Sequence, residues 1–311
     1  MQTNGQTNKK VALVTGATNG IGKVTALELA RAGYRVLFTS RDRTKGERVL
    51  EELMAQSGSD ALELYVGDLS SMAEVRRIAL EVRAKHPKLN LLVNNAGGVF
   101  MARQTTVDGF EYTFAFNHLS YFLLTNLLLE PLKAAEHARV LGSTAPIEPA
   151  RVVSVSSSAN YGGKIVWDDL EGSSRYSGFG AYAQSKLMNI LFANELAHRL
   201  SGTNVTSNSL HPGFVSTGFG DNSSSVMKAV LGVIKRFAAI TPEKGAETTL
   251  FLATSVEVQG VTGQFFDNKK VRRANPVAYD EAAQKRLWNL SEKLVAQWLD
   301  PVQSARAEAE V

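Results

Sequence analysis

The segment AYAQSK (181–186) places Tyr182 and Lys186 four positions apart, a spacing that brings both side chains to one face of a helix. A tyrosine phenol has an ordinary pKa of ~10 and exchanges protons poorly at pH 7. A lysine ammonium beside it stabilises the phenolate, so we expect Lys186 to lower the pKa of Tyr182. Such a pair could transfer a proton to a carbonyl oxygen while a hydride reaches the carbonyl carbon. The alternative is a solvated helix that carries a half-buried tyrosine.

A glycine-rich turn follows the first apolar segment. VALVT (11–15) continues into TGATNGIG (15–22), and an amphipathic helical pattern covers residues 21–33. Glycines allow a tight turn and close backbone approach, and the free N–H groups at the start of a helix bind phosphate. The spacing is G-x-x-x-G-x-G, which differs from G-x-G-x-x-G, and a purely structural turn is the alternative. Because the turn joins a strand to a helix, we predict a dinucleotide site.

The end of the second apolar segment favours NADP over NAD. RVLFTS (35–40) ends in Ser40 and is followed by Arg41 and Asp42. NAD sites usually place an acid at this point, whereas an arginine accommodates the additional phosphate of NADP. A guanidinium can hold a phosphate through two parallel hydrogen bonds. We therefore predict NADP(H) as the cofactor, with a solvated Arg41 that only ends the strand as the alternative.

Three later strand ends carry further polar or small residues. After the third predicted strand, Asp68 could bond the adenine amino group while Leu69 covers the ring. The fourth ends in NNAG (94–97), whose amides could bind a cofactor and whose small residues leave room for a flat ring. SVSSSA (154–159) ends the fifth and supplies three adjacent hydroxyls, one of which could hold a carbonyl oxygen. Each signal alone is weak, because Asn and Gly end many strands.

Short apolar segments alternate with helical patterns along the chain, which predicts a parallel sheet covered by helices on both faces. We expect one Rossmann-type, doubly wound α/β sheet of about seven strands within a single domain over residues 9–300. The polar residues 1–8 and the tail 301–311 are expected to be disordered and flexible. The predicted strands are VALVT (11–15), RVLFTS (35–40), LELYVGD (62–68), LNLLVNN (89–95), RVVSVSS (151–157), NVTSNSL (204–210) and GQFFD (263–267).

The composition of the 311-residue chain excludes several classes of function. It contains no cysteine, which excludes disulfides, thiolate metal sites and cysteine nucleophiles, so we predict no metal and a cytoplasmic location. The net charge of +4 is spread along the chain and predicts no nucleic-acid partner. The polar start lacks the apolar core of a signal peptide, and no apolar run approaches the ~20 residues of a membrane span.

Two segments interrupt the alternation of strands and helices. LGSTAPIEPA (141–150) contains two prolines and predicts a surface loop. Residues 214–242 begin with flexible polar residues and then become apolar, which predicts a lid over the substrate or a core-packing helix. Within it, residues 226–240 mix lysines and an arginine with apolar residues, so peripheral membrane contact is a further alternative.

These motifs, in this order and at these distances, resemble the short-chain dehydrogenase/reductase family. T-G-x-x-x-G-I-G, N-N-A-G, a serine after the fifth strand and Y-x-x-x-K are weak singly and specific together, and the match covers about residues 9–267. Within the family the chain is similar to the retinol dehydrogenase-like branch. The segments that carry this likeness are residues 108–129, 152–165, 181–200 and 210–219.

The resemblance implies a role for each matching residue. Tyr182 would be the catalytic acid/base, and Lys186 would be its electrostatic partner and bind the nicotinamide ribose. Ser157 would hold the carbonyl oxygen, with its two serine neighbours as alternatives, and Asn117 would hold a helix open for a proton-relay water. His118 and His211 are judged less suitable as catalytic bases. The expected cofactor-binding residues are Gly16, Thr18, Asn19, Gly20, Ile21, Gly22, Ser40, Arg41, Asp68, Leu69, Asn95, Ala96, Gly97, Tyr182, Lys186, Pro212, Gly213, Val215 and Thr217.

We therefore expect an NADP(H)-dependent oxidoreductase that interconverts an apolar aldehyde or ketone and its alcohol. The alternative is a catalytically silent protein that binds NADP(H) as a sensor or scaffold. Such proteins usually have an incomplete catalytic set, whereas all four residues of the set are present here. The resemblance also implies a possible homodimer, formed through the helices that contain Asn117 and Tyr182.

Overall fold

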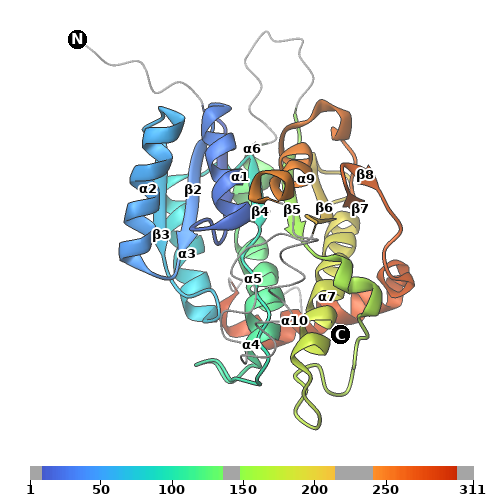
Figure 1. Ribbon diagram of the computed structural model, residues 1–311. Helices are drawn as coiled ribbons and strands as arrows, with labels where there is room; N and C mark the ends of the chain where they lie inside the picture. Colours follow the sequence, from blue (N-terminus) through green and yellow to red (C-terminus); the bar gives the residue numbers. More distant parts are fainter. Residues whose placement is uncertain (1–8, 136–147, 214–240, 300–311) are drawn as a thin grey trace, which may run out of the picture.

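The computed structural model describes residues 9–135, 148–213 and 241–299. An eight-stranded sheet runs through its centre in the order β3-β2-β1-β4-β5-β6-β7-β8 (Figure 1). The strands are β1 (Val11–Val14), β2 (Arg35–Ser40), β3 (Leu62–Val66), β4 (Leu91–Asn94), β5 (Ala150–Val155), β6 (Val205–His211), β7 (Phe265–Asp267) and β8 (Lys270–Val271).

The first seven strands are parallel and β8 pairs antiparallel with β7. The strand order reverses beside β1, so the chain leaves β1 and β4 in opposite directions and their carboxyl ends border a crevice. The predicted doubly wound parallel sheet is confirmed, and all seven predicted strands are present. The sequence missed β8, because two residues are too short to show a period of alternation.

Helices and short helical turns connect the strands. They are α1 (Gly20–Arg31), α2 (Arg43–Ser57), α3 (Met72–Lys85), α4 (Tyr112–Phe114), the π-helix η1 (Ala115–Leu119), α5 (Ser120–Leu127), α6 (Leu129–Ala135), η2 (Ser158–Gly162), α7 (Gly178–Arg199), α9 (Pro242–Thr254), η3 (Val256–Val258), η4 (Pro276–Tyr279), α10 (Glu281–Val295) and η5 (Ala296–Trp298).

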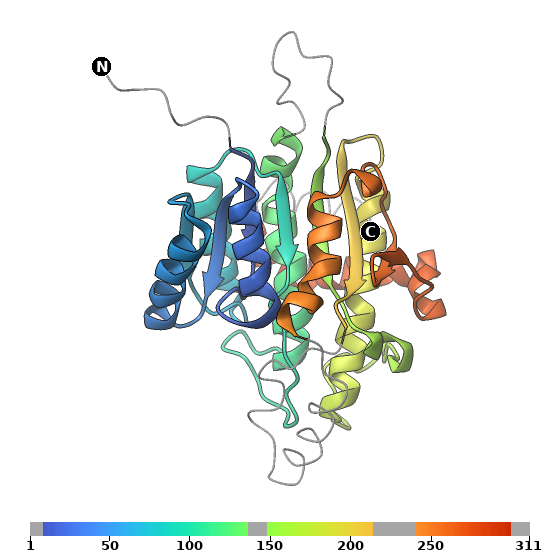
Figure 2. The ribbon, with the colours of Figure 1, turned by 45° about the horizontal axis from the view of Figure 1, so that its top comes forward.

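The sheet separates two apolar cores, one on each face. Successive strand residues point to opposite faces, so Leu13 packs into the core beneath α3, α5, α7 and α10, and Val14 packs into the core beneath α1, α2 and α9. Figure 2 shows these two helical layers on either side of the strands. Burial on both faces explains why the strand segments are almost continuously apolar.

The C-terminal helix α10 lies over α5 and α7. The Trp288 ring is 4.8 Å from the ring of Phe122 and 5.9 Å from that of Phe192, measured between centroids. The Ser291 hydroxyl bonds His118 Nε2 at 2.9 Å. A homodimer through the helices carrying Asn117 and Tyr182 stays a prediction, and it would have to accommodate α10 on this side of the molecule.

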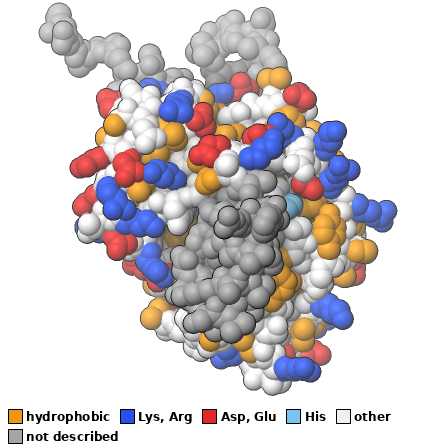
Figure 3. All heavy atoms as spheres, viewed as in Figure 1, with side chains coloured by type: hydrophobic (Ala, Val, Ile, Leu, Met, Phe, Trp, Pro, Cys, Tyr) orange, Lys and Arg blue, Asp and Glu red, His pale blue; other side chains and the backbone are white. Residues whose placement is uncertain are grey.

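Several predicted features lie outside the described residues. These are the N-terminal residues 1–8, most of the loop 141–150, nearly all of the segment 214–242 with Val215 and Thr217, and the tail 301–311. Within the part of the chain that the structure describes, no helix is both long and apolar enough to cross a membrane. Both acidic and basic side chains are scattered over the described part of the face in Figure 3.

Candidate active site

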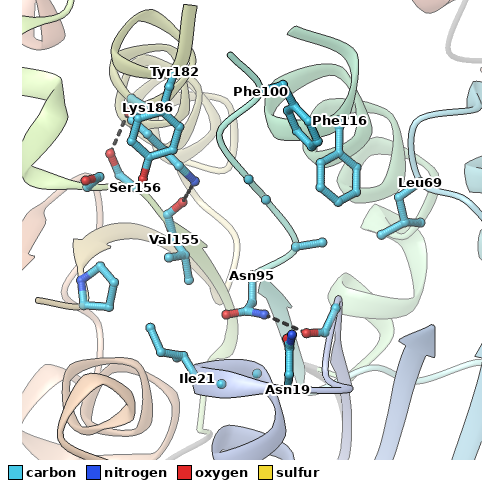
Figure 4. A pocket seen from close by; sticks show the side chains of 18 of the residues that line it. Asn19, Ile21, Leu69, Asn95, Phe100, Phe116, Val155, Ser156, Tyr182 and Lys186 are labelled. Atoms are coloured by element: carbon cyan, nitrogen blue, oxygen red, sulfur yellow. Dashed lines mark hydrogen bonds between the residues drawn. The ribbon is translucent and has the colours of Figure 1, made fainter. Parts of the chain in front are cut away.

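A cavity of about 560 Å³ opens at the carboxyl ends of the parallel strands. Its described wall contains every predicted cofactor-binding residue that the structure describes, together with Ser157. Figure 4 shows Tyr182 and Lys186 on one side of this cavity and Phe100, Phe116 and Leu69 on the other. The sheet thus brings together residues that are spread over about two hundred positions of sequence.

The glycine-rich turn has the shape that a bound phosphate group requires. Gly16 has φ +65°, and a Cβ there would lie 2.9 Å from the Cα of Ala96. A Cβ on Gly22 would lie 2.5 Å from Asn95 Nδ2. Asn19 precedes α1 without a side-chain cap, which leaves the first N–H groups of this twelve-residue helix for another acceptor. The turn therefore fits a dinucleotide phosphate at the helix start.

The NNAG segment is bonded to this turn. The Thr15 hydroxyl accepts hydrogen bonds from the backbone N–H of Asn95 at 2.9 Å and of Ala96 at 3.0 Å. In return, Asn95 Nδ2 donates to the carbonyl oxygen of Thr15 at 2.8 Å. Asn94 is buried and donates to Thr125 Oγ1, so its role is to hold β4 against α5. These bonds fix the floor of the cavity between β1 and β4.

Arg41 lines the cavity at the end of β2, where its Nη1 donates to the Tyr112 hydroxyl at 3.2 Å. The neighbouring carboxylate of Asp42 instead caps α2 and accepts from the backbone N–H of Lys45 at 2.8 Å. Asp68 and Leu69 lie at the end of β3 in the same wall. This end of the cavity therefore presents a guanidinium, while the nearby acid is engaged in a helix cap.

Tyr182 and Lys186 both project from α7 and are almost fully buried. Burial raises the pKa of Tyr182 to about 12, and a hydrogen bond with the Ser157 hydroxyl acts in the opposite direction. Burial lowers the pKa of Lys186 to about 7. The Lys186 ammonium donates to the carbonyl oxygen of Val155 at 3.0 Å (Figure 4). Burial is thus the larger effect on the Tyr182 phenol and raises its pKa overall, and a lowering of this pKa by Lys186 stays a prediction.

The three adjacent serines have different environments. Ser156 is buried, and its hydroxyl donates to the backbone carbonyl of Lys186 at 2.6 Å. Ser157 is half-buried, starts the turn η2 and bonds the Tyr182 phenol. Ser158 is exposed. The geometry therefore supports Ser157 as the hydroxyl beside the phenol, in agreement with the sequence interpretation.

Asn117 lies in the π-helix η1, in which the Ser120 N–H bonds the carbonyl of Ala115 five residues earlier. A π-helical turn of this kind often marks a functional site. The Asn117 side chain is buried directly behind Gly97, where an added Cβ would come within 3.2 Å of both Asn117 Oδ1 and Lys186 Nζ. The structure thus brings Asn117 close to the lysine, as the sequence interpretation requires.

The aromatic part of the wall was not predicted. The rings of Phe100 and Tyr112 are 4.5 Å apart, and Phe116 lies 6.1 Å from Phe100 and 5.9 Å from Tyr112. Phe179 lines the cavity beside Tyr182, with their ring centroids 6.2 Å apart. Their positions in the sequence could have identified two of these residues, because Phe100 follows NNAG closely and Phe116 directly precedes Asn117.

The two histidines that could have been bases differ in position. His118 is fully buried between Phe114 and Phe192, and burial lowers its pKa to about 4. His211 lines the cavity at the end of β6, next to Pro212 and Gly213, and burial also lowers its pKa. His118 is therefore a packing residue of the core, and among the described histidines only His211 reaches the cavity wall.

A doubly wound sheet with a glycine-rich turn at the point where the strand order reverses defines a dinucleotide-binding Rossmann-type protein. The sequence matches the family described as short chain dehydrogenase over residues 10–228, so the chain belongs to this family of oxidoreductases. The match includes the glycine-rich turn, NNAG, Ser157, Tyr182 and Lys186.

Curated relatives extend the likeness over most of the chain. Human retinol dehydrogenase 14 is 39% identical over 92% of this chain and 86% of its own length. Mouse retinol dehydrogenase 12 is 40% identical over 95% and 90%, and human polyprenol dehydrogenase is 37% identical over 91% and 85%. The likeness to the retinol dehydrogenase branch is therefore confirmed.

Solved structures show the same fold. A protein from Mycobacterium paratuberculosis superposes with a TM-score of 0.71 at 32% identity and covers 92% of this chain and 93% of its own. The Pseudomonas aeruginosa RhlG/NADP active-site complex superposes with a TM-score of 0.64 at 27% identity and covers 83% and 93%. Both support the assignment of the overall fold.

Proposed function

We propose that this oxidoreductase uses NADP(H) to interconvert an apolar aldehyde or ketone and its alcohol. The observation that carries the proposal is the position of Tyr182, bonded to Ser157, in the wall of the same cavity as the glycine-rich turn and Arg41. When bound, NADPH supplies the hydride in the reducing direction. The protein supplies the binding surface, the orientation of the carbonyl and the proton.

The residues of the cavity fit a nicotinamide dinucleotide phosphate. The backbone around Gly16 and Gly22 leaves no room for a Cβ and offers N–H groups at the start of α1. Arg41 has no carboxylate partner among the described residues and would hold the additional phosphate, because Asp42 is committed to capping α2. An NADP complex among the structural relatives supports this preference.

The catalytic residues would act on the carbonyl oxygen. Ser157 would donate a hydrogen bond that holds this oxygen, and Tyr182 would transfer its proton to it. A phenol with a pKa of about 12 stays protonated at neutral pH and is ready to donate in the reducing direction. Lys186 Nζ lies 5.7 Å from the centroid of the Tyr182 ring, and Lys186 and Asn117 would resupply the proton from solvent.

The aromatic wall supports an apolar substrate. Phe179 lies beside Tyr182, and its side chain is 61% exposed, so it offers apolar surface at the reacting end of the cavity. Relatives that are named for retinol and polyprenol point to the same class of compound. A silent sensor or scaffold is less well supported, because Ser157, Tyr182 and Lys186 line one cavity and Asn117 lies close to Lys186.

The test is the initial rate of NADPH oxidation, compared with NADH, on aldehydes that range from short aliphatic compounds to retinal. We expect a higher initial rate with NADPH than with NADH, and a rate that increases as the apolar part of the aldehyde becomes larger. A preference for NADH would contradict the role of Arg41. Tight binding of NADPH without turnover of any aldehyde would contradict the reductase and support the sensor.

A further inference from the structure

Ser185 lies between Tyr182 and Lys186 in sequence, is 1% exposed and bonds the side chain of Asn117. We propose that Ser185 is a positioning residue for proton transfer: its hydroxyl holds the amide of Asn117 and so fixes the π-helical turn η1 against α7. The inference rests on the proposed function, because it places Asn117 on the path that resupplies the proton of Tyr182.

The direction of each hydrogen bond follows from the single proton of a serine hydroxyl. Ser185 Oγ donates this proton to the backbone carbonyl of Tyr182 at 2.8 Å. Toward Asn117 the same oxygen can therefore only accept, and Asn117 Nδ2 donates to it at 3.0 Å. Ser185 thus requires that the nitrogen of the Asn117 amide, and not its oxygen, faces α7.

The remaining groups of the Asn117 amide bond the backbone of Gly98. Nδ2 donates its second proton to the carbonyl oxygen of Gly98 at 2.9 Å, and Oδ1 accepts from the Gly98 N–H at 2.9 Å. Both amide protons are then used, in a place where Asn117 is 0% exposed. Removal of the Ser185 hydroxyl would leave a buried N–H without its acceptor, an arrangement that proteins rarely keep. The amide would be expected to move.

A movement of the Asn117 amide would change the surroundings of the Lys186 ammonium. A Cβ on Gly97 would lie 3.2 Å from both Asn117 Oδ1 and Lys186 Nζ, so the amide oxygen and the ammonium approach the same point. Lys186 follows Ser185 directly in the chain, and Tyr182 supplies the carbonyl that Ser185 bonds. Ser185 therefore joins the backbone of the proton donor to the side chain that we place on its proton path.

A purely structural role for Ser185 would not require its hydrogen bond with Asn117. A serine inside a helix commonly bonds a carbonyl three or four residues earlier and needs no further partner. Ser207 is a control from a strand: it is fully buried on β6, and its hydroxyl donates to a backbone carbonyl of α7, that of Ala193, at 2.9 Å. The additional bond to Asn117, which is 68 residues away in sequence, distinguishes Ser185.

The test is a double-mutant cycle on the full chain. Ser185→Ala, Asn117→Ala, the double variant and the control Ser207→Ala are compared in kcat, in the pH profile of kcat and in NADPH affinity measured by fluorescence. We expect Ser185→Ala to lower kcat about tenfold, a part of the ~10²–10⁴ that a positioned proton-transfer group contributes. The pH profile should move and NADPH affinity should change by less than about twofold, while the double variant resembles Asn117→Ala alone.

Ser185→Thr retains the hydroxyl and should recover most of the lost kcat, and thermal midpoints verify that each variant is folded. The role of Ser185 would be overturned if the loss of kcat in the double variant equalled the product of the two single losses. It would also be overturned if Ser207→Ala lowered kcat as much as Ser185→Ala. Neither result would contradict the activity of the wild-type protein. Absence of turnover in the wild-type protein would overturn the proposed function, and this inference with it.

Discussion

Near Tyr182 the polar side chains of Asn117, Ser185 and Lys186 are buried and hydrogen-bonded, whereas Arg41 at the other end of the cavity is exposed. Asn117, Ser185 and Lys186 are at most 3% exposed, and each has partners on another segment of the chain. Arg41 is exposed and its described hydrogen bond is the one to Tyr112. The two ends of one cavity are thus held in different ways.

The difference follows from what each end has to do. Proton transfer requires groups held within a few tenths of an ångström, and only burial with complete hydrogen bonding provides that. Phosphate recognition by a guanidinium tolerates more movement, because the charged bonds are strong and the partner brings its own geometry. We therefore expect substitutions at the Tyr182 end to act on turnover, and those at the Arg41 end to act on affinity.

The largest effect is expected for Tyr182→Phe, which removes the acidic hydroxyl and keeps the ring. Turnover should fall by at least ~10³, within the range for a lost general acid. NADPH affinity should stay within about twofold, because the ring still packs in the cavity wall. Single-turnover rates and fluorescence titration measure the two quantities. Tyr279→Phe, outside the cavity wall, is the control, and retained turnover in Tyr182→Phe would exclude it as the acid.

Burial of Lys186 predicts how stability depends on pH. Its pKa falls from the ordinary 10.5 to about 7, so between these values the unfolded chain binds a proton that the folded chain lacks. The free energy of unfolding should therefore rise with pH from about 7 to 10.5, with a slope of up to about 1.4 kcal/mol per pH unit from this group. Below pH 7 both states are protonated and the slope from Lys186 disappears.

Lys186→Met should lose this slope. Urea unfolding of the wild type and the variant at several pH values between 7 and 9 measures it. Lys88→Met, which removes the same charge from an exposed position, should retain the wild-type slope. Equal slopes in the wild type and Lys186→Met would mean that the ammonium is not desolvated as described.

At the other end of the cavity, Arg41→Gln should weaken NADPH binding by about 10–100-fold, corresponding to ~1.5–3 kcal/mol for hydrogen bonds to a charged group. NADH affinity should change little, because NADH lacks the additional phosphate. Fluorescence titration with both nucleotides measures this, with the exposed Arg43→Gln as the control. A parallel loss for both nucleotides would assign Arg41 a role other than phosphate recognition.

The smallest effect is expected for Tyr112→Phe, which keeps the ring against Phe100 and removes the hydroxyl that accepts from Arg41. The loss of one neutral acceptor should weaken NADPH binding by about 2–5-fold, or ~0.5–1 kcal/mol. Turnover at saturating NADPH should not change. A fall in kcat instead would show that the two ends of the cavity are coupled.

The fold and most of the cavity wall could be predicted because they depend on local patterns. Apolar runs set the strands, and residues at the ends of parallel strands must meet at one edge of the sheet. The direction of the shift in the Tyr182 pKa could not be predicted, because it depends on how deeply α7 is buried. That depth is a property of the whole fold. Phe100 and Phe116 were missed because an aromatic residue next to a strand or in a helix is equally typical of the core.

Ser185 was missed for a different reason. The bond between Ser185 and Asn117 joins positions 68 residues apart, and a hydroxyl inside a helix gives no sign of a distant partner. Asn117 itself was found through the family motif, not through its surroundings. Sequence patterns thus identified the groups that touch the ligand cavity better than the groups that hold them.

The position of α10 has a consequence for the synthesis of the protein on the ribosome. Trp288 and Ser291 come from the last long helix of the described chain, yet they pack on Phe122, Phe192 and His118, which belong to its middle. A nascent chain that ends before residue 281 would leave this apolar side of α5 and α7 uncovered. The helix that carries Tyr182 therefore acquires this packing partner only after residues 281–295 have been made.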